Sequence, residues 1–133
     1  MEQFADRFKI AFGSPLSFFL SIAILAFLLR AAVAGEYEDG LAAVKKEDYR
    51  TAFKKWEPLA EKGNPDAQFG LGYMYLQGQG VVLNYKEAMK WFRMAAEQGD
   101  PDAQNNLGGM YLKGNGVLQD YQEAVKWYRL SAD

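Results

Sequence analysis

The sequence lacks histidine and cysteine altogether. These residue types supply the most frequent general base, the thiol nucleophile and most protein ligands of zinc, so the usual hydrolytic triads and zinc sites are excluded. Hydroxyl nucleophiles are almost as scarce, because the chain after residue 34 holds one serine, Ser131, and one threonine, Thr51. Ser131 lies 36 residues after Ala95, one period of a repeat, and we interpret it as a small helix-packing residue. The composition therefore predicts a protein that is not an enzyme, with no cofactor and no metal ion.

Blocks of basic charge are also absent. From Gly35 onward the chain carries 12 lysine and arginine residues against 15 aspartate and glutamate residues, a net charge of −3 with the two signs interspersed. Nucleic acid is therefore not an expected partner. Since no disulfide can form, we expect the fold to depend on packing, and all three tryptophans and all eight tyrosines follow residue 34.

Residues 1–34 have the features of a secretory signal peptide. The uncharged apolar run Leu16–Leu29 follows two basic residues, Arg7 and Lys9, and precedes the small-residue site Ala32–Ala34. This order is typical of a segment that is cleaved at its end during export. We therefore predict a periplasmic or secreted mature chain.

The alternative is an uncleaved inner-membrane anchor. A spanning helix needs about 20 apolar residues, and Ile10–Leu29 reaches that length although it includes three serines and a proline. A membrane is a partner only in this alternative. Both interpretations place the rest of the chain outside the cytoplasm.

The rest of the chain repeats itself with a period of 36 residues. Pro65–Gln68 has the same four residues as Pro101–Gln104, and the pair Gly78-x-Gly80 returns as Gly114-x-Gly116. A period between about 20 and 50 residues is the mark of a solenoid of stacked units. Such proteins usually present binding surfaces.

Each unit predicts two helices joined by a loop that contains Gly-x-Gly. Asn64 and Asp100 are suitable N-caps, and each precedes a proline, which is favoured at the first helical position. Gly72 and Gly108 inside the first helices indicate close approach of a neighbouring backbone. The expected helices span 65–77, 84–98, 101–113 and 120–132.

A fainter copy precedes these two units. Tyr49 lies 36 residues before Tyr85, and the pattern predicts a second helix over 48–62 and a shortened first helix over 37–46. The expected architecture is thus all-α: an α/α solenoid of about three helix-turn-helix repeats, preceded by the N-terminal signal or hydrophobic segment. The expected repeats are a degenerate first one at 35–63, a second at 64–99 and a third, uncapped one at 100–133, whose face with Trp127, Tyr128 and Leu130 we expect to be uncovered.

The motif A-x-x-x-L-G-x-x-Y-x-x-G-x-G-V, followed by D-Y-x-E-A-x-K-W-Y, resembles the Sel-one-like repeat, a relative of the tetratricopeptide repeat. The resemblance is strong over 65–132 and weak over 36–62, and Asn84 replaces the usual aspartate but keeps the capping role. It implies an α/α solenoid that acts as an adaptor in protein complexes. Exported bacterial members of the family resemble cell-envelope or host-interaction factors.

The two clear units differ on one side of their first helices, and we expect a ligand there. Phe69, Gly70 and Tyr73 share a helix face, and their counterparts are two asparagines and a glycine, Gly109. In a tetratricopeptide-like stack this side lines the concave groove, and glutamines beside it would hydrogen-bond an extended peptide. A solvated surface that varies freely is the competing interpretation. The residues predicted to bind a protein or peptide are Gln68, Phe69, Tyr73, Gln104, Asn105 and Asn106.

Catalytic interpretations of the remaining motifs are weaker. Glu87 and Glu123 are the best candidates for a pair of acid and base carboxylates, but each stands three residues after a helix N-cap, the arrangement of a capping box. The Gly-x-Gly loop follows a helix and lacks the lysine of a phosphate-binding loop. We interpret both as structural.

Three hypotheses about function remain. The first is a non-catalytic scaffold or adaptor of the bacterial cell envelope that binds a protein or peptide on its concave first-helix face. The second is an enzyme acting on cell-wall or β-lactam substrates, as some exported relatives imply, although those relatives are rich in cysteine. The third is an adaptor tethered to the membrane by its uncleaved N-terminal segment.

Overall fold

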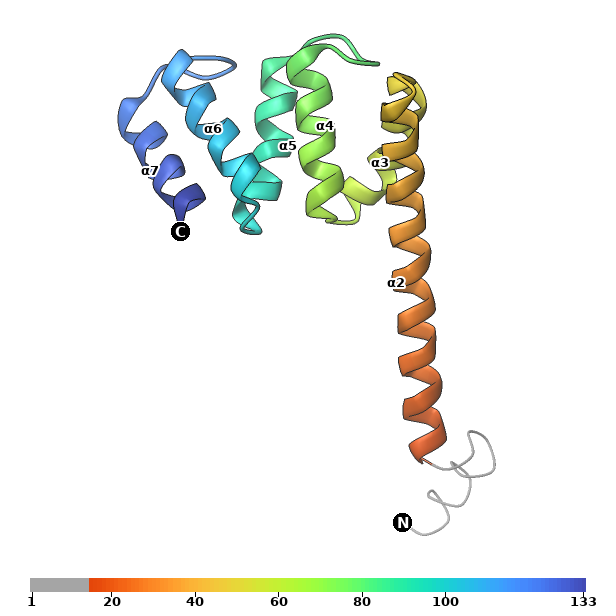
Figure 1. Ribbon diagram of the computed structural model, residues 1–133. Coiled ribbons are helices and arrows are strands. Elements are labelled where there is room, and N and C mark those ends of the chain that lie inside the picture. Colours follow the sequence, from red (N-terminus) through yellow and green to blue (C-terminus); the bar gives the residue numbers. More distant parts are fainter. Residues whose placement is uncertain (1–14) are drawn as a thin grey trace. The chain divides into compact units, whose positions relative to one another are not determined.

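The computed structural model describes residues 15–133, apart from the side chains of residues 15, 17 and 18, and this part of the chain is helical without a strand (Figure 1). The predicted leader charges, Arg7 and Lys9, lie outside the described residues. The all-α prediction is confirmed. The helices are α2 (Pro15–Lys45), α3 (Tyr49–Glu61), α4 (Pro65–Gln77), α5 (Tyr85–Glu97), α6 (Pro101–Lys113) and α7 (Tyr121–Ala132).

The chain divides into two compact units, Met1–Gly35 and Glu36–Asp133. In the first unit, α2 carries exposed apolar side chains from Leu16 to Leu29. The stretch Phe19–Lys45 is long and apolar enough to cross a membrane by length and composition, and none of its most apolar window is buried. A signal sequence and an anchor both fit this finding.

The prediction of a separate short helix over 37–46 is wrong, because the helix starts much earlier in the chain. These residues continue α2, which runs unbroken through Gly35 and Gly40 to Lys45. A single glycine costs a helix only about 1 kcal/mol against alanine, so neither one ends it. The predicted cleavage site therefore lies inside a helix.

From α3 to α7 each helix packs against the next one along the chain, so the helix pairs stack side by side (Figure 1). The predicted caps are confirmed: Oδ1 of Asn64 accepts a hydrogen bond from the N–H of Ala67 at 2.9 Å, and Asp100 accepts one from Ala103 at 2.7 Å. Pro65 and Pro101 follow them as the first helical residues. Local chemistry at these ends thus sets where the helices begin.

The Gly-x-Gly loops connect the two helices of a pair and also contact the preceding pair. Gly80 has a φ of +73°, and a Cβ there would lie 2.7 Å from the backbone carbon of Tyr49 at the start of α3. Gly116, with a φ of +74°, meets the backbone of Tyr85 in the same way. Each loop therefore packs against the second helix of the preceding pair, which explains why both glycines are repeated.

The capping box is only half formed. Oδ1 of Asn84 accepts from the N–H of Glu87 at 3.2 Å, as predicted. The return bond is absent because the N–H of Asn84 donates to the carbonyl of Tyr75. The carboxylate of Glu87 instead lies 3.7 Å from Nζ of Lys90, and Glu123 forms the equivalent pair in α7.

Glycines within the first helices make room for rings. A Cβ on Gly72 would lie 2.7 Å from Phe92, and one on Gly108 would lie 2.9 Å from Tyr128. The predicted close neighbour is therefore an aromatic side chain of the second helix in the same pair, not a backbone. Trp127, predicted on an uncovered face, is 7% exposed and belongs to the core, whereas Leu130 is exposed.

Candidate protein-binding groove

Two of the predicted binding residues, Gln68 and Gln104, lie inside the protein. Nε2 of Gln68 donates to the carbonyl of Ala60 at 3.0 Å, and Nε2 of Gln104 donates to that of Ala96 at 3.1 Å. Oε1 of Gln68 also accepts from Gln98 at 2.8 Å. Their side chains are 1% and 7% exposed, so a surface peptide does not reach them. The structure gives both glutamines a different role, which is to join a first helix to the end of the preceding pair.

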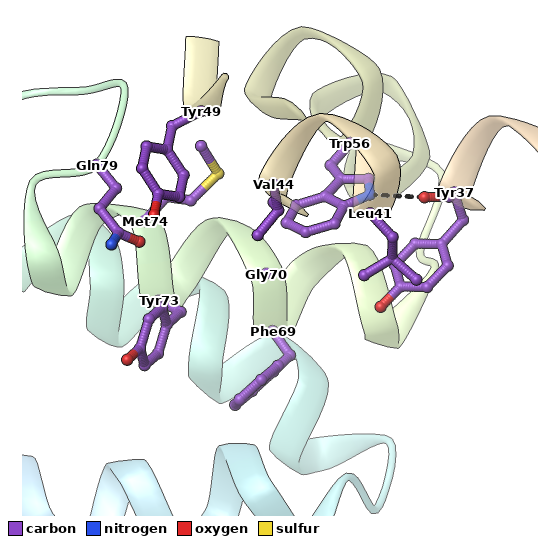
Figure 2. A pocket seen from close by; sticks show the side chains of 10 residues that line it. All are labelled: Tyr37, Leu41, Val44, Tyr49, Trp56, Phe69, Gly70, Tyr73, Met74 and Gln79. Carbon is purple, nitrogen blue, oxygen red and sulfur yellow. Dashed lines mark hydrogen bonds between the residues drawn. The ribbon is translucent and has the colours of Figure 1, made fainter. Parts of the chain in front are cut away.

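Phe69, Gly70 and Tyr73, in contrast, lie together in the wall of a cavity of about 390 Å³ between the end of α2, α3 and α4 (Figure 2). We call it the aromatic cavity. It is open to solvent, and apart from Gln79 its walls are apolar or aromatic. Its aromatic residues are Tyr37, Tyr49, Trp56, Phe69 and Tyr73.

Trp56 forms one wall of the aromatic cavity and is rigidly held. Its Nε1 donates to the carbonyl of Tyr37 at 3.1 Å, and the two rings stack with centroids 5.5 Å apart. Gly40 of α2 and Gly70 of α4 face its ring from two helices, and a Cβ on Gly70 would lie 2.6 Å from it. The glycines at 40 and 70 therefore allow a large indole to fit where the next unit has Phe92.

Phe69 and Tyr73 differ in how much of the ring is free. Phe69 is half-buried and lies 5.7 Å from the core ring of Phe92, while the centroids of Phe69 and Tyr73 are 6.4 Å apart. The side chain of Tyr73 is 43% exposed. Phe69 thus supports the fold as well as the cavity, and Tyr73 is the more available of the two to a ligand.

Asn105, Asn106 and Gly109 line a second cavity, of about 170 Å³, one repeat further along. Five of its residues, from Asn105 to Asn115, are the counterparts of residues that line the aromatic cavity. Nδ2 of Asn106 donates to the carbonyl of Asp102 at 2.8 Å. Lys113 and Tyr128 complete its more polar lining. The two cavities therefore lie at equivalent positions beside successive first helices, one aromatic and one more polar, and we refer to them together as the first-helix groove.

Carboxylates lie near the Tyr37 side of the aromatic cavity. Burial raises the pKa of the Tyr37 phenol, and the carboxylates of Asp66, Glu38 and Asp100 raise it further. Asp66 is the only charged residue of α4. Within residues 15–133, no cluster of three or more histidine, cysteine or acidic side chains is suited to a metal ion.

Sequence reasoning missed Tyr37 and Trp56 as members of the site. Tyr37 lies 36 residues before Tyr73, so the period could have identified Tyr37 as the counterpart of a predicted binding residue. Trp56 carried none, because its counterpart Phe92 is a fully buried core residue and a buried aromatic residue is the ordinary expectation on a helix face.

Comparison with known families assigns the repeat. The family model described as the Sel1 repeat matches residues 28–64, 65–100 and 101–133. Its first match begins inside the apolar run, before the predicted start of the first repeat at residue 35.

Two solved bacterial structures are similar to the chain. A protective antigen present in uropathogenic Escherichia coli strains, which displays an SLR fold, is 39% identical with a TM-score of 0.73, over 77% of this chain and 23% of the antigen. A Sel1 repeat protein from Oxalobacter formigenes is 41% identical with a TM-score of 0.69, over 72% of this chain and 40% of that protein. The chain thus spans less than half the length of either. Comparison with curated proteins found no match.

Proposed function

We propose that this chain, which belongs to the Sel1 repeat family, is a non-catalytic adaptor of the bacterial cell envelope that binds a protein or peptide along its first-helix groove. Sel1 repeat proteins are generally protein-interaction scaffolds. One observation carries the choice of groove: the cavity that combines Phe69, Gly70 and Tyr73 lies on the side where the two clear repeats differ. Differences between repeats that share a fold are the expected location of specificity.

The walls of the groove suit a protein partner. Residues that dominate binding energy at interfaces are enriched in tryptophan and tyrosine seated in pockets, and the aromatic cavity holds one tryptophan and three tyrosines. Its volume of about 390 Å³ falls in the range of sites that receive a small group. Tyr73 and Asn105 are exposed, so a segment lying over both cavities can touch side chains from two repeats.

The enzymatic alternative has little support among the described residues. The carboxylates of Glu87 and Glu123 are each engaged by a lysine at i+3, and neither lines a cavity described above. Ser131 donates its hydroxyl to the carbonyl of Tyr128 at 2.8 Å, which is a helix-packing role. A hydrolase therefore remains the less favoured hypothesis.

A tethered form of the adaptor is the second candidate. The observation that favours it is the unbroken helix α2, which carries an exposed apolar surface through the predicted cleavage site. Mass spectrometry of the N-terminus of the chain isolated from cells separates the two forms. A mature chain that begins at Gly35 means cleavage, and an intact N-terminus in the membrane fraction means a tether.

The groove is tested by capture of partners from a bacterial envelope extract with the full chain as bait. Phe69→Ala combined with Tyr73→Ala should leave the helix content unchanged by circular dichroism and weaken the capture of partners. The matched control is Leu118→Ala combined with Tyr121→Ala, because both side chains are exposed outside the groove. If the two double variants capture equally well, the groove assignment is wrong.

A further inference from the structure

The aromatic cavity is walled by flat rings, and no charged side chain is among the described residues that line it (Figure 2). Tyr37, Tyr49 and Trp56 contribute rings from α2 and α3, and α4 contributes Phe69 and Tyr73. The faces of such rings carry negative charge density and attract a cation placed over them, and the cation is more often arginine than lysine. These walls accept a guanidinium group or an apolar group, so the surrounding charges decide between the two.

The charges that act on Tyr37 are negative. The carboxylates of Asp66, Glu38 and Asp100 all act on the phenol of Tyr37 in the cavity wall. Asp66 is exposed and lies one helical turn before Phe69, on the same face of α4. A cation that enters the cavity therefore meets aromatic faces inside and carboxylates outside, whereas an anion is repelled.

No basic side chain is among the charged groups that act on the Tyr37 phenol. Nζ of Lys55 lies 3.3 Å from the Asp39 carboxylate, and neither α4 nor the first eleven residues of α6 contain lysine or arginine. The second cavity is different, because Lys113 lines it. A like charge disfavours a cationic guest there, so only the aromatic cavity is suited to one.

We propose that the aromatic cavity holds an arginine side chain of the peptide or protein segment that occupies the groove. This inference rests on the proposed function and adds the chemistry of the anchoring residue. A guanidinium group stacks flat on aromatic rings. It is more weakly hydrated than an ammonium group, so its transfer from water into the cavity costs less free energy. Its remaining N–H groups point outward, where carboxylates such as that of Asp66 form charge-assisted hydrogen bonds.

The test uses fluorescent peptides of glycine and serine with one variable central residue, which is arginine, citrulline or leucine. Citrulline has nearly the shape of arginine but no charge. Binding to the full chain in detergent micelles is followed by fluorescence anisotropy. The arginine peptide should bind about tenfold more tightly than the citrulline peptide, the ratio that corresponds to one desolvated cation–π contact.

Two variants locate the effect. Tyr73→Ala removes a wall of the cavity and Asp66→Asn removes a rim charge, and each should weaken binding of the arginine peptide by about threefold or more. Asp102→Asn is the matched control, because Asp102 holds the same position in α6 and has the same effect on the helix dipole. It should leave the affinity within about twofold.

Each other result overturns the inference. Equal affinity for arginine and citrulline means that the cavity does not recognise charge, and tighter binding of leucine means that its anchor is apolar. In both cases the proposed groove survives. Equal losses for Asp66→Asn and Asp102→Asn indicate general attraction rather than a site. If no peptide binds, the arginine site is rejected, while partner capture by the envelope experiment tests the groove independently.

Discussion

Replacing Gly70 with alanine tests how the aromatic cavity is built. The new methyl group would lie 2.6 Å from two ring carbons of Trp56, and Trp56 is 5% exposed and fixed by its bond to the carbonyl of Tyr37. Overpacking of this kind costs about 1–3 kcal/mol. Alanine in place of glycine inside a helix stabilises the folded state by about 1 kcal/mol. We therefore expect the free energy of unfolding to fall by about 1 kcal/mol.

Two companion variants separate crowding from helix propensity. A methyl group on Gly109 of α6 meets only the hydroxyl oxygen of Tyr128, at 3.5 Å, so Gly109→Ala should raise the free energy of unfolding by about 1 kcal/mol. One period of 36 residues further along, the counterpart of Gly70 is Asn106 and the counterpart of Trp56 is Phe92. In a Trp56→Phe background, Gly70→Ala should therefore cease to destabilise.

Urea unfolding of the full chain in micelles, followed by far-ultraviolet circular dichroism, gives these free energies. We expect Gly70→Ala to destabilise the protein with Trp56 and not the Trp56→Phe variant, which is a coupling between neighbouring residues. If Gly70→Ala stabilises the unchanged protein as much as Gly109→Ala does, the indole is not wedged against α4. The account of the cavity wall would then be wrong.

Three further predictions concern two contacts between repeats and one helix cap. Gly80→Ala should destabilise by about 2 kcal/mol more than Gly99→Ala, because both glycines have a positive φ but only the first faces backbone of a neighbouring helix; denaturant unfolding measures the difference. Gln68→Leu should cost about 1–3 kcal/mol by the same assay, since two hydrogen bonds are lost, one from Nε2 to the carbonyl of Ala60 and one from Gln98 to Oε1. Hydrogen bonds from the side chain and backbone N–H of Thr51 lower the pKa of Asp48. The stability that this cap contributes is therefore present above about pH 4 and is lost as the pH falls through the lowered pKa. Asp48→Asn should keep the cap and remove this pH dependence, which unfolding measured at a series of pH values tests.

Helix ends and the period were predictable because their causes are local. Asn64 and Asp100 accept hydrogen bonds from backbone groups three residues away, and sequence alone contains that spacing. The glycines at 78 and 114 end helices in the left-handed conformation, which also follows from residue type. The continuity of α2 was not predicted, because residues 1–34 were assigned to a leader and the first repeat was expected to start at residue 35. No strong stop signal separates the two segments, and α2 runs through both.

The site could be predicted only in part, since it lies between units. The mismatch between Phe69, Tyr73 and their counterparts pointed to residues that line the aromatic cavity. The same argument failed for Gln68, because a repeated residue beside a groove can face inward as easily as outward, and here it bonds to Ala60. Trp56 enters the cavity only through the stacking of α2 on α3, which no local pattern encodes.

The most direct test of the central claim is site-specific photo-crosslinking in living bacteria that express the full chain. A photoreactive residue replaces Asn105 in the groove or, as a control, Gln122, which is exposed on α7. We predict a discrete cross-linked product from position 105 that Tyr73→Ala diminishes, and no such product from position 122. Equal products from both positions, or a product from 105 that is indifferent to Tyr73→Ala, would contradict the assignment of the first-helix groove as the binding surface.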